Sequence, residues 1–497
     1  MLFGRNEIMK KKTIKKTTRR EMLKTMALSA GLFVCRWDEQ TVMAQQRGQG
    51  QGGGGVGQRA PLPIAASNPS IRHHKNRCKS CGRCREFCRN EITVFGRTVP
   101  PSEDACIRCG QCTMYCKRYA LTEQYHYPVV VKAVADSDLI TVASTSPAIR
   151  VALGEMFRMP CGTNVEGKIV GALKRLGVNH VLDTAFSADL TVMEEASELL
   201  QRINDNGMKN SLPMFTSCCP AWVRFVKLFY PGLLPNLSTV KSPVMMQGAM
   251  VKTYFAQKIG IDPTNMVHIA LTPCTAKKAE ILLPGMNAAG ILHEKPEMQD
   301  VDIALTCREL AYLINDAKID FAQMPEGTYD SLMGAGSGAG MIFGNTGGVM
   351  EAALRTAYKL LNDKNPPADF LNLRPVRGFD SVRTAIVDIG KRSLHVAVVH
   401  GIAKTRPLFE SIRNGERKFD FIEVMACPGG CIGGGGQPIN FDIGAMKLKQ
   451  HRLNALYQRD TENKIRLSYD NPQIQAIYAE FLGKPLDGKA KTLLHYR

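Results

Sequence analysis

Cysteine spacing constrains this chain more than any other feature of its sequence. Of its 16 cysteines, eight form two clusters with the identical spacing C-x2-C-x2-C-x3-C, which begin at Cys78 and at Cys106. A disulfide scaffold is short and dense in Cys, whereas this chain has 497 residues, of which 44% are hydrophobic. The cysteines therefore indicate metal ligation in a chain large enough for two or three domains, and a disordered or fibrous chain is excluded.

The two clusters match the spacing of bacterial two-cluster ferredoxins. Thiolates at two-residue gaps can surround one corner of a cuboidal iron–sulfur cluster, and the fourth Cys of each run ligates the other cluster. We therefore expect two 4Fe–4S clusters. One would be held by Cys78, Cys81, Cys84 and Cys116, and the other by Cys106, Cys109, Cys112 and Cys88. Zinc is the alternative metal. Two clusters without a substrate pocket of their own indicate electron transfer.

Residues 1–44 resemble a twin-arginine export signal. A basic run, 10–16, precedes the pair Arg19 and Arg20, and a weakly apolar stretch, 25–34, follows. This stretch is too short for a bilayer, which needs about 20 apolar residues. The small-residue sequence ending at Ala44 fits a cleavage site. We expect export by the twin-arginine machinery to the periplasm or another extracytoplasmic site, with or without membrane association. A basic, disordered tail is the alternative.

Short apolar runs alternate with helical patterns through the rest of the chain. The runs are Leu139–Ala143, His180–Leu182, Val267–Leu271, Ile303–Leu305, Val396–Val399 and Phe421–Met425. Helical patterns such as 194–203 and 350–361 lie between them. This alternation predicts an α/β fold with a mainly parallel sheet covered by helices.

Three further cysteine motifs follow these runs or begin a helix, where open α/β folds place their sites. They span 216–222, 272–280 and 423–438. Pro220 suits a first helical position, so a thiolate at Cys219 would gain from the helix N-terminus. The glycines of the third motif let the backbone approach a bulky inorganic ligand. Four cysteines suffice for a third 4Fe–4S cluster, although any one alone could be a buried structural cysteine: Cys219, Cys274, Cys427 and Cys431.

These three motifs resemble the active-site signatures of the iron-only, or FeFe, hydrogenases. The resemblance extends from about residue 71 to the C-terminus and implies a six-iron active site, the H-cluster. Its cubane would be joined through the Cys431 sulfur to a two-iron unit that carries carbonyl, cyanide and an azadithiolate bridge. The resemblance also implies a catalytic α/β domain of two lobes, each a mainly parallel sheet flanked by helices, beside a small α+β ferredoxin-like domain.

The expected domain order follows from these features. The signal peptide, 1–44, leads into a Gln/Gly-rich linker, 45–70, and a two-cluster ferredoxin-like domain, 71–125. The catalytic domain would span 126–440. The tail, 441–497, resembles the small subunit of the family, here fused to the large one.

The resemblance also implies roles for single residues. Cys218 matches the proton-relay thiol, and Lys277 matches the lysine that hydrogen-bonds a cyanide ligand. The relay would continue through Glu195, Ser238, Glu198 and Arg202, although glutamates on a helix usually form a solvated face. The residues that resemble the pocket lining are Ser146, Pro147, Ser242, Phe343, Gly344 and Met425.

Two positions depart from the family pattern. Thr272 and Val244 stand where many members have Met and Gln, at positions that contact the two-iron unit in the family. These departures bear on the rate and the direction of catalysis. Cys35, Cys161 and Cys307 match no signature and are expected to be structural.

The predicted function is reversible oxidation of H2 and reduction of protons. Electrons would pass through the two 4Fe–4S clusters to an external carrier: a ferredoxin, a cytochrome or a membrane quinone-linked subunit. Hydrogenase maturation proteins are expected partners, and nucleic acid is not. Residues 71–89 carry seven Lys or Arg against one acid, which indicates either a docking face for an acidic carrier or charge balance for the clusters.

Two alternative functions remain open at this stage. A hydrogenase-like iron–sulfur assembly or electron-transfer protein would lack the two-iron unit. The Cys218-Cys219 pair, the intact 433–438 run and the export signal argue against it. An H2 sensor would usually lack the relay thiol and would append a signalling domain.

Overall fold

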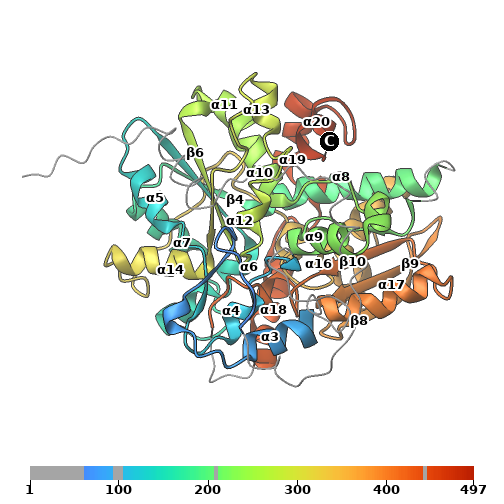
Figure 1. The fold of residues 1–497 in the computed structure, drawn as a ribbon. Coiled ribbons are helices and arrows are strands. Elements are labelled where there is room, and N and C mark those ends of the chain that lie inside the picture. Colours follow the sequence, from blue (N-terminus) through green and yellow to red (C-terminus); the bar gives the residue numbers. More distant parts are fainter. Residues whose placement is uncertain (1–60, 93–104, 206–210, 440–444, 497) are drawn as a thin grey trace, which may run out of the picture.

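The computed structural model describes residues 61–92, 105–205, 211–439 and 445–496 (Figure 1). The predicted signal peptide and most of the predicted linker lie outside the described residues. Among those that are described, no helix combines the length and the apolar character needed to cross a membrane.

The first lobe is built on a parallel four-stranded sheet with the order β4-β3-β6-β7. Its strands are β3 (Ile140–Thr145), β4 (His180–Asp183), β6 (Met266–Thr272) and β7 (Ile303–Thr306). Helices α5 (Tyr127–Val134), α7 (Glu166–Arg175) and α14 (Cys307–Asp316) bury their apolar residues against one face. Helices α8 (Thr184–Asn204) and α10 (Pro243–Met250) cover the other. Because both faces are covered, nearly every residue of these strands is buried.

The second lobe has a four-stranded sheet with the order β5-β10-β9-β8. Strands β5 (Met214–Phe215), β10 (Phe421–Met425) and β9 (Ser393–His400) are parallel, and β8 (Val382–Asp388) pairs with β9 in the antiparallel sense. Helices α9 (Pro220–Phe229) and α17 (Thr405–Arg413) pack on one face, and α16 (Gly348–Asn362) packs on the other with the second half of α8. Figure 1 shows α8 extending from the first lobe into the second.

The expected two-lobed catalytic fold is confirmed. All six apolar runs singled out in the sequence lie in strands, and the two helical patterns lie within α8 and α16. Two strands of the lobes, β5 and β8, were not predicted from the sequence. The first has two residues. The second is an edge strand with several exposed positions, so its apolar pattern is weak.

The N-terminal region contains a repeated local structure. Strands β1 (Ile71–His73) and β2 (Leu121–Glu123) pair in the antiparallel sense and enclose α3 (Arg83–Phe87) and α4 (Gln111–Tyr115). Each helix follows a glycine with positive φ, Gly82 (77°) and Gly110 (70°), four residues after the first Cys of its run. At Gly110 a side chain would also collide with Thr275, because a Cβ would lie 2.3 Å from its hydroxyl oxygen.

The tail wraps both lobes. Helix α18 (Ala445–Glu462) packs Leu453 and Leu456 on Ile432, and its Asp460 forms a buried ion pair with Arg355 of α16 (2.9 Å). The chain continues through α19 (Pro472–Ile477) to α20 (Gly488–Leu494), which packs in the core beneath α10. In Figure 1 these red segments lie at opposite ends of the molecule, with α18 near α3 and α4 and α20 near α10.

Candidate active site

A cavity of about 730 Å³ lies between the lobes at the carboxyl ends of strands from both sheets. The residues that follow β3, β6 and β10 line it directly, and the segment after β5 brings Cys218 to its wall. Parallel strands place their carboxyl ends at one edge, where open α/β folds bind ligands. The arrangement brings the three cysteine motifs, which are far apart in the sequence, to one place.

The four cysteines of those motifs line this cavity together. They are Cys219, Cys274, Cys427 and Cys431. Burial raises the pKa of all four thiols, that of Cys274 to about 12. Bare thiolates are therefore disfavoured here, whereas a bound cationic metal cluster would hold them deprotonated. A cavity of this size with four converging thiols fits a bulky iron–sulfur group.

The helix N-terminus favours a thiolate at Cys219, as expected, but burial has the larger effect on its pKa. Cys219 is the N-cap of α9 and Pro220 is the first helical residue, as predicted. The backbone N–H groups of Ala221 and Trp222 do lower the pKa of the Cys219 thiol, but burial outweighs them and the net shift is upward. The helix N-terminus alone therefore does not make this thiol a free thiolate.

The glycines of the third motif lie close to other backbone segments. Gly430, with φ 82°, and Gly434 line the cavity, and a Cβ at Gly434 would lie 2.4 Å from the Pro273 carbonyl oxygen. Gly435 instead meets the N-terminal region, because a Cβ there would lie 2.2 Å from the Cys109 carbonyl oxygen. At Gly436 a Cβ would lie 2.7 Å from the Thr306 side chain. Part of this glycine run therefore serves backbone packing.

The other eight cysteines line two separate cavities. One cavity contains Cys78, Cys81, Cys84 and Cys116, and the other contains Cys88, Cys106, Cys109 and Cys112. Each set takes three cysteines from one run and one from the other, which is the crossed pairing expected from the spacing. In the described part of the chain, no three His, Cys, Asp or Glu side chains converge closely enough to hold a single metal ion.

The three cysteine sets lie in series. The charge of Cys84 acts on the Cys112 thiol, and the charge of Cys109 acts on the Cys427 thiol. Gln111 of α4 hydrogen-bonds Cys427 and also donates to the Gly433 carbonyl (2.7 Å). The second cysteine set therefore adjoins the main cavity, and the first set adjoins the second.

Cys218 and Lys277 occupy one wall of the main cavity. The Lys277 ammonium donates to the Cys218 carbonyl (3.1 Å) and pairs with Glu280 (2.7 Å). Burial alone would lower the pKa of Lys277, but Glu280 and the neighbouring thiols raise it, so this lysine remains a cation. Burial, with the charge of Glu195, raises the pKa of the Cys218 thiol, which keeps it protonated.

The glutamates of α8 are buried, so the solvated-face interpretation is wrong. Glu195 is 1% exposed, and neither of its carboxyl oxygens makes a well-formed hydrogen bond within the described ranges. Burial, reinforced by the charge of Glu198, raises the pKa of Glu195 to about 8. A carboxyl group of this kind can be protonated or ionised near neutral pH, as a proton relay requires.

Glu198 lies at the centre of a hydrogen-bond network. Its carboxylate accepts from the Ser238 hydroxyl (3.1 Å), the Thr239 hydroxyl (3.0 Å) and the Arg202 guanidinium (2.6 Å). Arg202 also donates to main-chain carbonyls, including that of Leu237 (2.7 Å). The structure therefore brings all six predicted catalytic residues into one region: Cys218, Lys277, Glu195, Ser238, Glu198 and Arg202.

Most of the predicted lining residues reach the main cavity. Ser146, Pro147, Phe343, Gly344 and Met425 line it, as do the two departures, Thr272 and Val244. Ser242 is not among the lining residues. It is the N-cap of α10, where its hydroxyl accepts from Met245 N–H, and the following Pro243 and Val244 form the wall instead.

Several residues near the site were not predicted from the sequence. Ala148, Thr184 and Ala188 line the cavity from α8 and from α6 (Pro147–Arg150), and such small residues give no sequence signal for this role. Glu280 could have been found, because it lies three residues after Lys277 on one helix face. Cys307 is fully buried and Cys161 is partly buried, and neither lines any of the three cysteine cavities.

Comparison with known proteins agrees with this arrangement. The family model for the iron-only hydrogenase large subunit, C-terminal domain, matches residues 139–435, and the iron hydrogenase small subunit model matches residues 446–497. The NADP-reducing hydrogenase subunit of Solidesulfovibrio fructosivorans is 42% identical over 86% of this chain and 74% of its own. The periplasmic Fe hydrogenase large subunit of Nitratidesulfovibrio vulgaris is 44% identical over 73% of this chain and 85% of its own.

Solved structures agree as well. A variant of the FeFe hydrogenase from Chlamydomonas reinhardtii is 37% identical, with a TM-score of 0.65, and covers 75% of this chain and 98% of its own. The cytosolic iron–sulfur assembly component 3 of Bos taurus is more distant, at 29% identity over 73% of this chain and 75% of its own. The chain therefore belongs to the iron-only (FeFe) hydrogenases, enzymes that work with an H-cluster, and carries a small-subunit-like tail in the same polypeptide.

Proposed function

We propose that this enzyme interconverts H2 with two protons and two electrons in the cavity between its lobes, and exchanges the electrons through its N-terminal region. The observation that carries the proposal is the meeting of four cysteines and a fifth thiol, Cys218, in one cavity. When bound, the H-cluster supplies the redox chemistry and a metal–base pair that splits H2.

The residues that would hold the H-cluster follow from the cavity wall. Cys219, Cys274, Cys427 and Cys431 would ligate the cubane, and Cys431 would also join the two-iron unit. Lys277, kept cationic by Glu280, would donate a hydrogen bond to a cyanide ligand. The apolar wall, which includes Val244, Phe343 and Met425, would exclude bulk water from the reacting atoms.

The N-terminal cysteines supply the electron connection in this proposal. Two 4Fe–4S clusters would occupy the two smaller cysteine sets, in a ferredoxin-like domain that includes the repeated helices α3 and α4. The electrostatic influence of Cys84 on Cys112 and of Cys109 on Cys427 supports a series that leads from the surface to the main cavity. Cys81 is exposed, so the outer set is accessible to an external carrier such as a ferredoxin, a cytochrome or a quinone-linked subunit.

The proton path in this proposal uses side chains on α8 and on the segment after β5. Cys218 would exchange a proton with the cavity. Glu195, whose pKa burial raises to about 8, would accept it and pass it by way of the Ser238 hydroxyl to Glu198. Arg202 would hold the Glu198 carboxyl group in position, because its guanidinium pairs with that group at 2.6 Å. Each proton therefore leaves the cavity without bulk water entering it.

In this proposal, the mature enzyme reaches an extracytoplasmic site by export through the twin-arginine route. The route carries folded proteins, so clusters and H-cluster would be inserted in the cytoplasm by maturation proteins before export. The relative from Nitratidesulfovibrio vulgaris is named as periplasmic, which supports an extracytoplasmic site. Replacement of Arg19 and Arg20 by Lys should retain the loaded enzyme in the cytoplasm. An unchanged extracytoplasmic fraction would contradict the proposal.

Infrared spectroscopy combined with iron analysis tests the central assignment. Three cubanes and a two-iron unit on twelve cysteines predict 14 iron atoms per chain, with carbonyl and cyanide bands. Conversion of Cys431 to Ser should remove those bands, while the eight N-terminal cysteines retain their iron. A protein with about eight iron atoms and no carbonyl bands after maturation would instead favour an assembly or electron-transfer role.

A further inference from the structure

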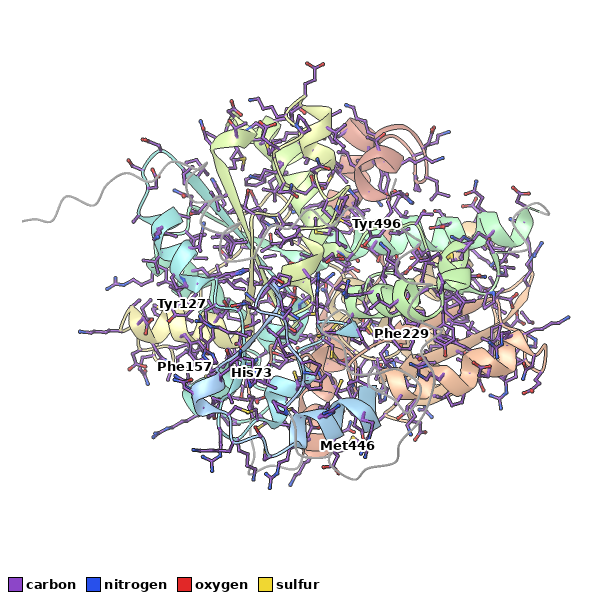
Figure 2. The ribbon with its side chains drawn as sticks, in the orientation of Figure 1. His73, Tyr127, Phe157, Phe229, Met446 and Tyr496 are labelled. Carbon is purple, nitrogen blue, oxygen red and sulfur yellow. The ribbon has the colours of Figure 1, made fainter. Side chains whose placement is uncertain are left out.

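The end of the C-terminal tail is anchored beside the proposed proton relay. The N–H of Tyr496, labelled in Figure 2, donates to the Thr239 carbonyl (2.7 Å), and the Lys241 N–H donates to the Leu494 carbonyl (2.8 Å). Val240 and His495 form the antiparallel bridge between them. The His495 imidazole, 4% exposed, thereby reaches the Thr239 side chain.

His495 joins two buried carboxylates through hydrogen bonds. Its Nδ1 lies 2.8 Å from the Thr239 hydroxyl oxygen, which in turn lies 3.0 Å from Glu198 Oε2. Its Nε2 lies 2.9 Å from Glu194 Oε2. Glu194 also accepts from the Tyr478 hydroxyl and from the Leu486 N–H (2.7 Å). One continuous chain of bonds therefore runs from the relay into the tail.

This chain lacks one proton when His495 is neutral and both carboxylates are ionised. A neutral imidazole has one N–H. If Nε2 carries it and donates to Glu194, then the single hydroxyl proton of Thr239 can bond to either Nδ1 or Glu198 but not to both, while Glu198 keeps its bonds from the Thr239 N–H, Ser238 and Arg202. If Nδ1 carries it, Nε2 and the Glu194 carboxylate are two acceptors that face each other. One added proton pairs every donor with an acceptor.

We infer that Glu198, Thr239 and His495 form a branch of the relay, in which His495 takes up one proton from Glu198 and returns it. The inference rests on the relay proposed above. In the forward step, the carboxyl proton of Glu198 moves to the Thr239 oxygen as the Thr239 proton moves to His495 Nδ1. The O–H bond of Glu198 breaks, one O–H bond forms and one breaks at the Thr239 oxygen, and one N–H bond forms at His495 Nδ1, so Glu198 becomes a carboxylate as His495 becomes an imidazolium.

Charged groups lie on both sides of His495. Glu194 lies at its Nε2 (2.9 Å), Glu198 lies beyond the Thr239 hydroxyl, and the Arg202 guanidinium pairs with Glu198 on the far side (2.6 Å). Lys241, the nearest lysine along the paired segment, is directed to Asp300 (3.6 Å). Anchoring of the tail does not require the imidazole, because Leu493, Leu494 and the two backbone bonds already supply it.

A hydroxyl deletion tests the branch against a structural role. Thr239→Val removes the bridging hydroxyl, and the matched control Thr239→Ser retains it. In the matured enzyme, Thr239→Val and His495→Gln should each lower turnover by about tenfold and remove the same ionisation from its pH profile. The double variant should be no worse than either single variant, because both break one path. Thr239→Ser should follow the wild-type profile.

A second measurement does not depend on turnover. Infrared difference spectra between acid and alkaline pH, recorded with isotope-labelled histidine, should contain an imidazolium band that is lost in His495→Gln. The band should shift in Thr239→Val and remain in Thr239→Ser. An unchanged pH profile in Thr239→Val, additive losses in the double variant, or equal behaviour of Thr239→Val and Thr239→Ser would overturn the branch.

The relay and the branch can fail separately. If Cys218→Ala removes turnover while Thr239→Val matches the wild type, the relay stands and the branch is wrong. If Cys218→Ala keeps full turnover, the relay itself is wrong.

Discussion

Gln111 of the N-terminal region donates a hydrogen bond of 2.7 Å to the carbonyl oxygen of Gly433, in the loop that follows Cys431. Both residues are buried, and the same amide also hydrogen-bonds the Cys427 thiol. One side chain therefore connects the second cysteine set to the wall of the active-site cavity.

The Gln111 bond predicts a defect in both stability and redox potential. Gln111→Ala would leave the Gly433 carbonyl buried without this partner, which should cost about 1–3 kcal/mol. The variant would also lose the hydrogen bond from the Gln111 amide to Cys427, a proposed ligand of the active-site cubane. The cubane should then be harder to reduce, so its reduction potential should fall. Thermal unfolding and a redox titration followed by electron paramagnetic resonance measure the two effects.

The matched control for Gln111 is Gln458→Ala on the exposed face of α18, where the amide pairs only with Glu462. This change should alter stability by less than about 0.5 kcal/mol and leave the potential unchanged. If Gln111→Ala behaves like the control, the connection has no energetic role.

Cys218 should be essential for proton transfer but not for cluster binding. It lines the cavity beside a proposed ligand without being one. Cys218→Ser or Cys218→Ala should therefore keep all 14 irons but lower turnover by about 10²–10⁴-fold, the usual contribution of a positioned acid or base. Cys161→Ala, at a partly buried thiol away from the cavity, is the control and should keep full turnover. Loss of iron in the Cys218 variants would show that Cys218 is a ligand instead.

Glu195 should make the wild-type protein less stable as the pH rises. Its pKa in the folded protein is about 8, against 4.5 for the model carboxyl, so between these values the unfolded chain releases a proton that the folded chain retains. Stability attributable to this group is therefore full below about pH 4.5 and decreases up to about pH 8, by about 1.4 kcal/mol per unit of pKa difference at most.

Glu195→Gln removes this titration. The variant should gain thermal stability relative to the wild type between pH 5 and pH 8, while it loses turnover because the relay is interrupted. Glu416→Gln, at an exposed position, should show no pH-dependent difference. A constant difference in melting temperature across this range would mean that Glu195 titrates normally in the folded protein.

The basic surface around the outer cysteine set should steer an acidic electron carrier. Lys79 and Arg83 line that cavity and are exposed. Docking guided by long-range charge weakens as salt shortens the Debye length from about 30 Å at 0.01 M to about 10 Å at 0.1 M. Turnover with the protein carrier should therefore fall with salt, whereas turnover with a small neutral dye should barely change.

Charge reversal tests whether these two residues cause the salt dependence of turnover. Lys79→Glu with Arg83→Glu should remove most of the salt dependence with the protein carrier. The control pair, Lys484→Glu with Lys491→Glu, lies on the exposed surface near α20, at the opposite end of the molecule in Figure 1, and should keep it. If turnover with the carrier and turnover with the dye respond equally to salt, the docking interpretation is wrong. The basic residues would then serve only to balance the charge of the clusters.

The sequence by itself determined the elements and the chemistry of the cysteines. Strands such as β3 and β6 were predictable because both of their faces are buried, so each appears as a short, mainly apolar run. The two-residue gaps of Cys78–Cys84 and Cys106–Cys112 are local, and local spacing is enough to predict which thiols can share a cluster. The crossed placement of Cys88 and Cys116 in the two cavities matches that spacing.

The tertiary structure alone decided which polar groups became buried partners. Glu194, Glu195 and Glu198 look like a solvated helix face until both lobes and the tail close over α8. His495 lies 256 residues from Thr239, and no local pattern relates the two. A buried polar group must find its partner wherever the fold supplies one, because leaving it unpaired costs free energy. Such pairings depend on the packing of distant segments, which no local sequence pattern encodes.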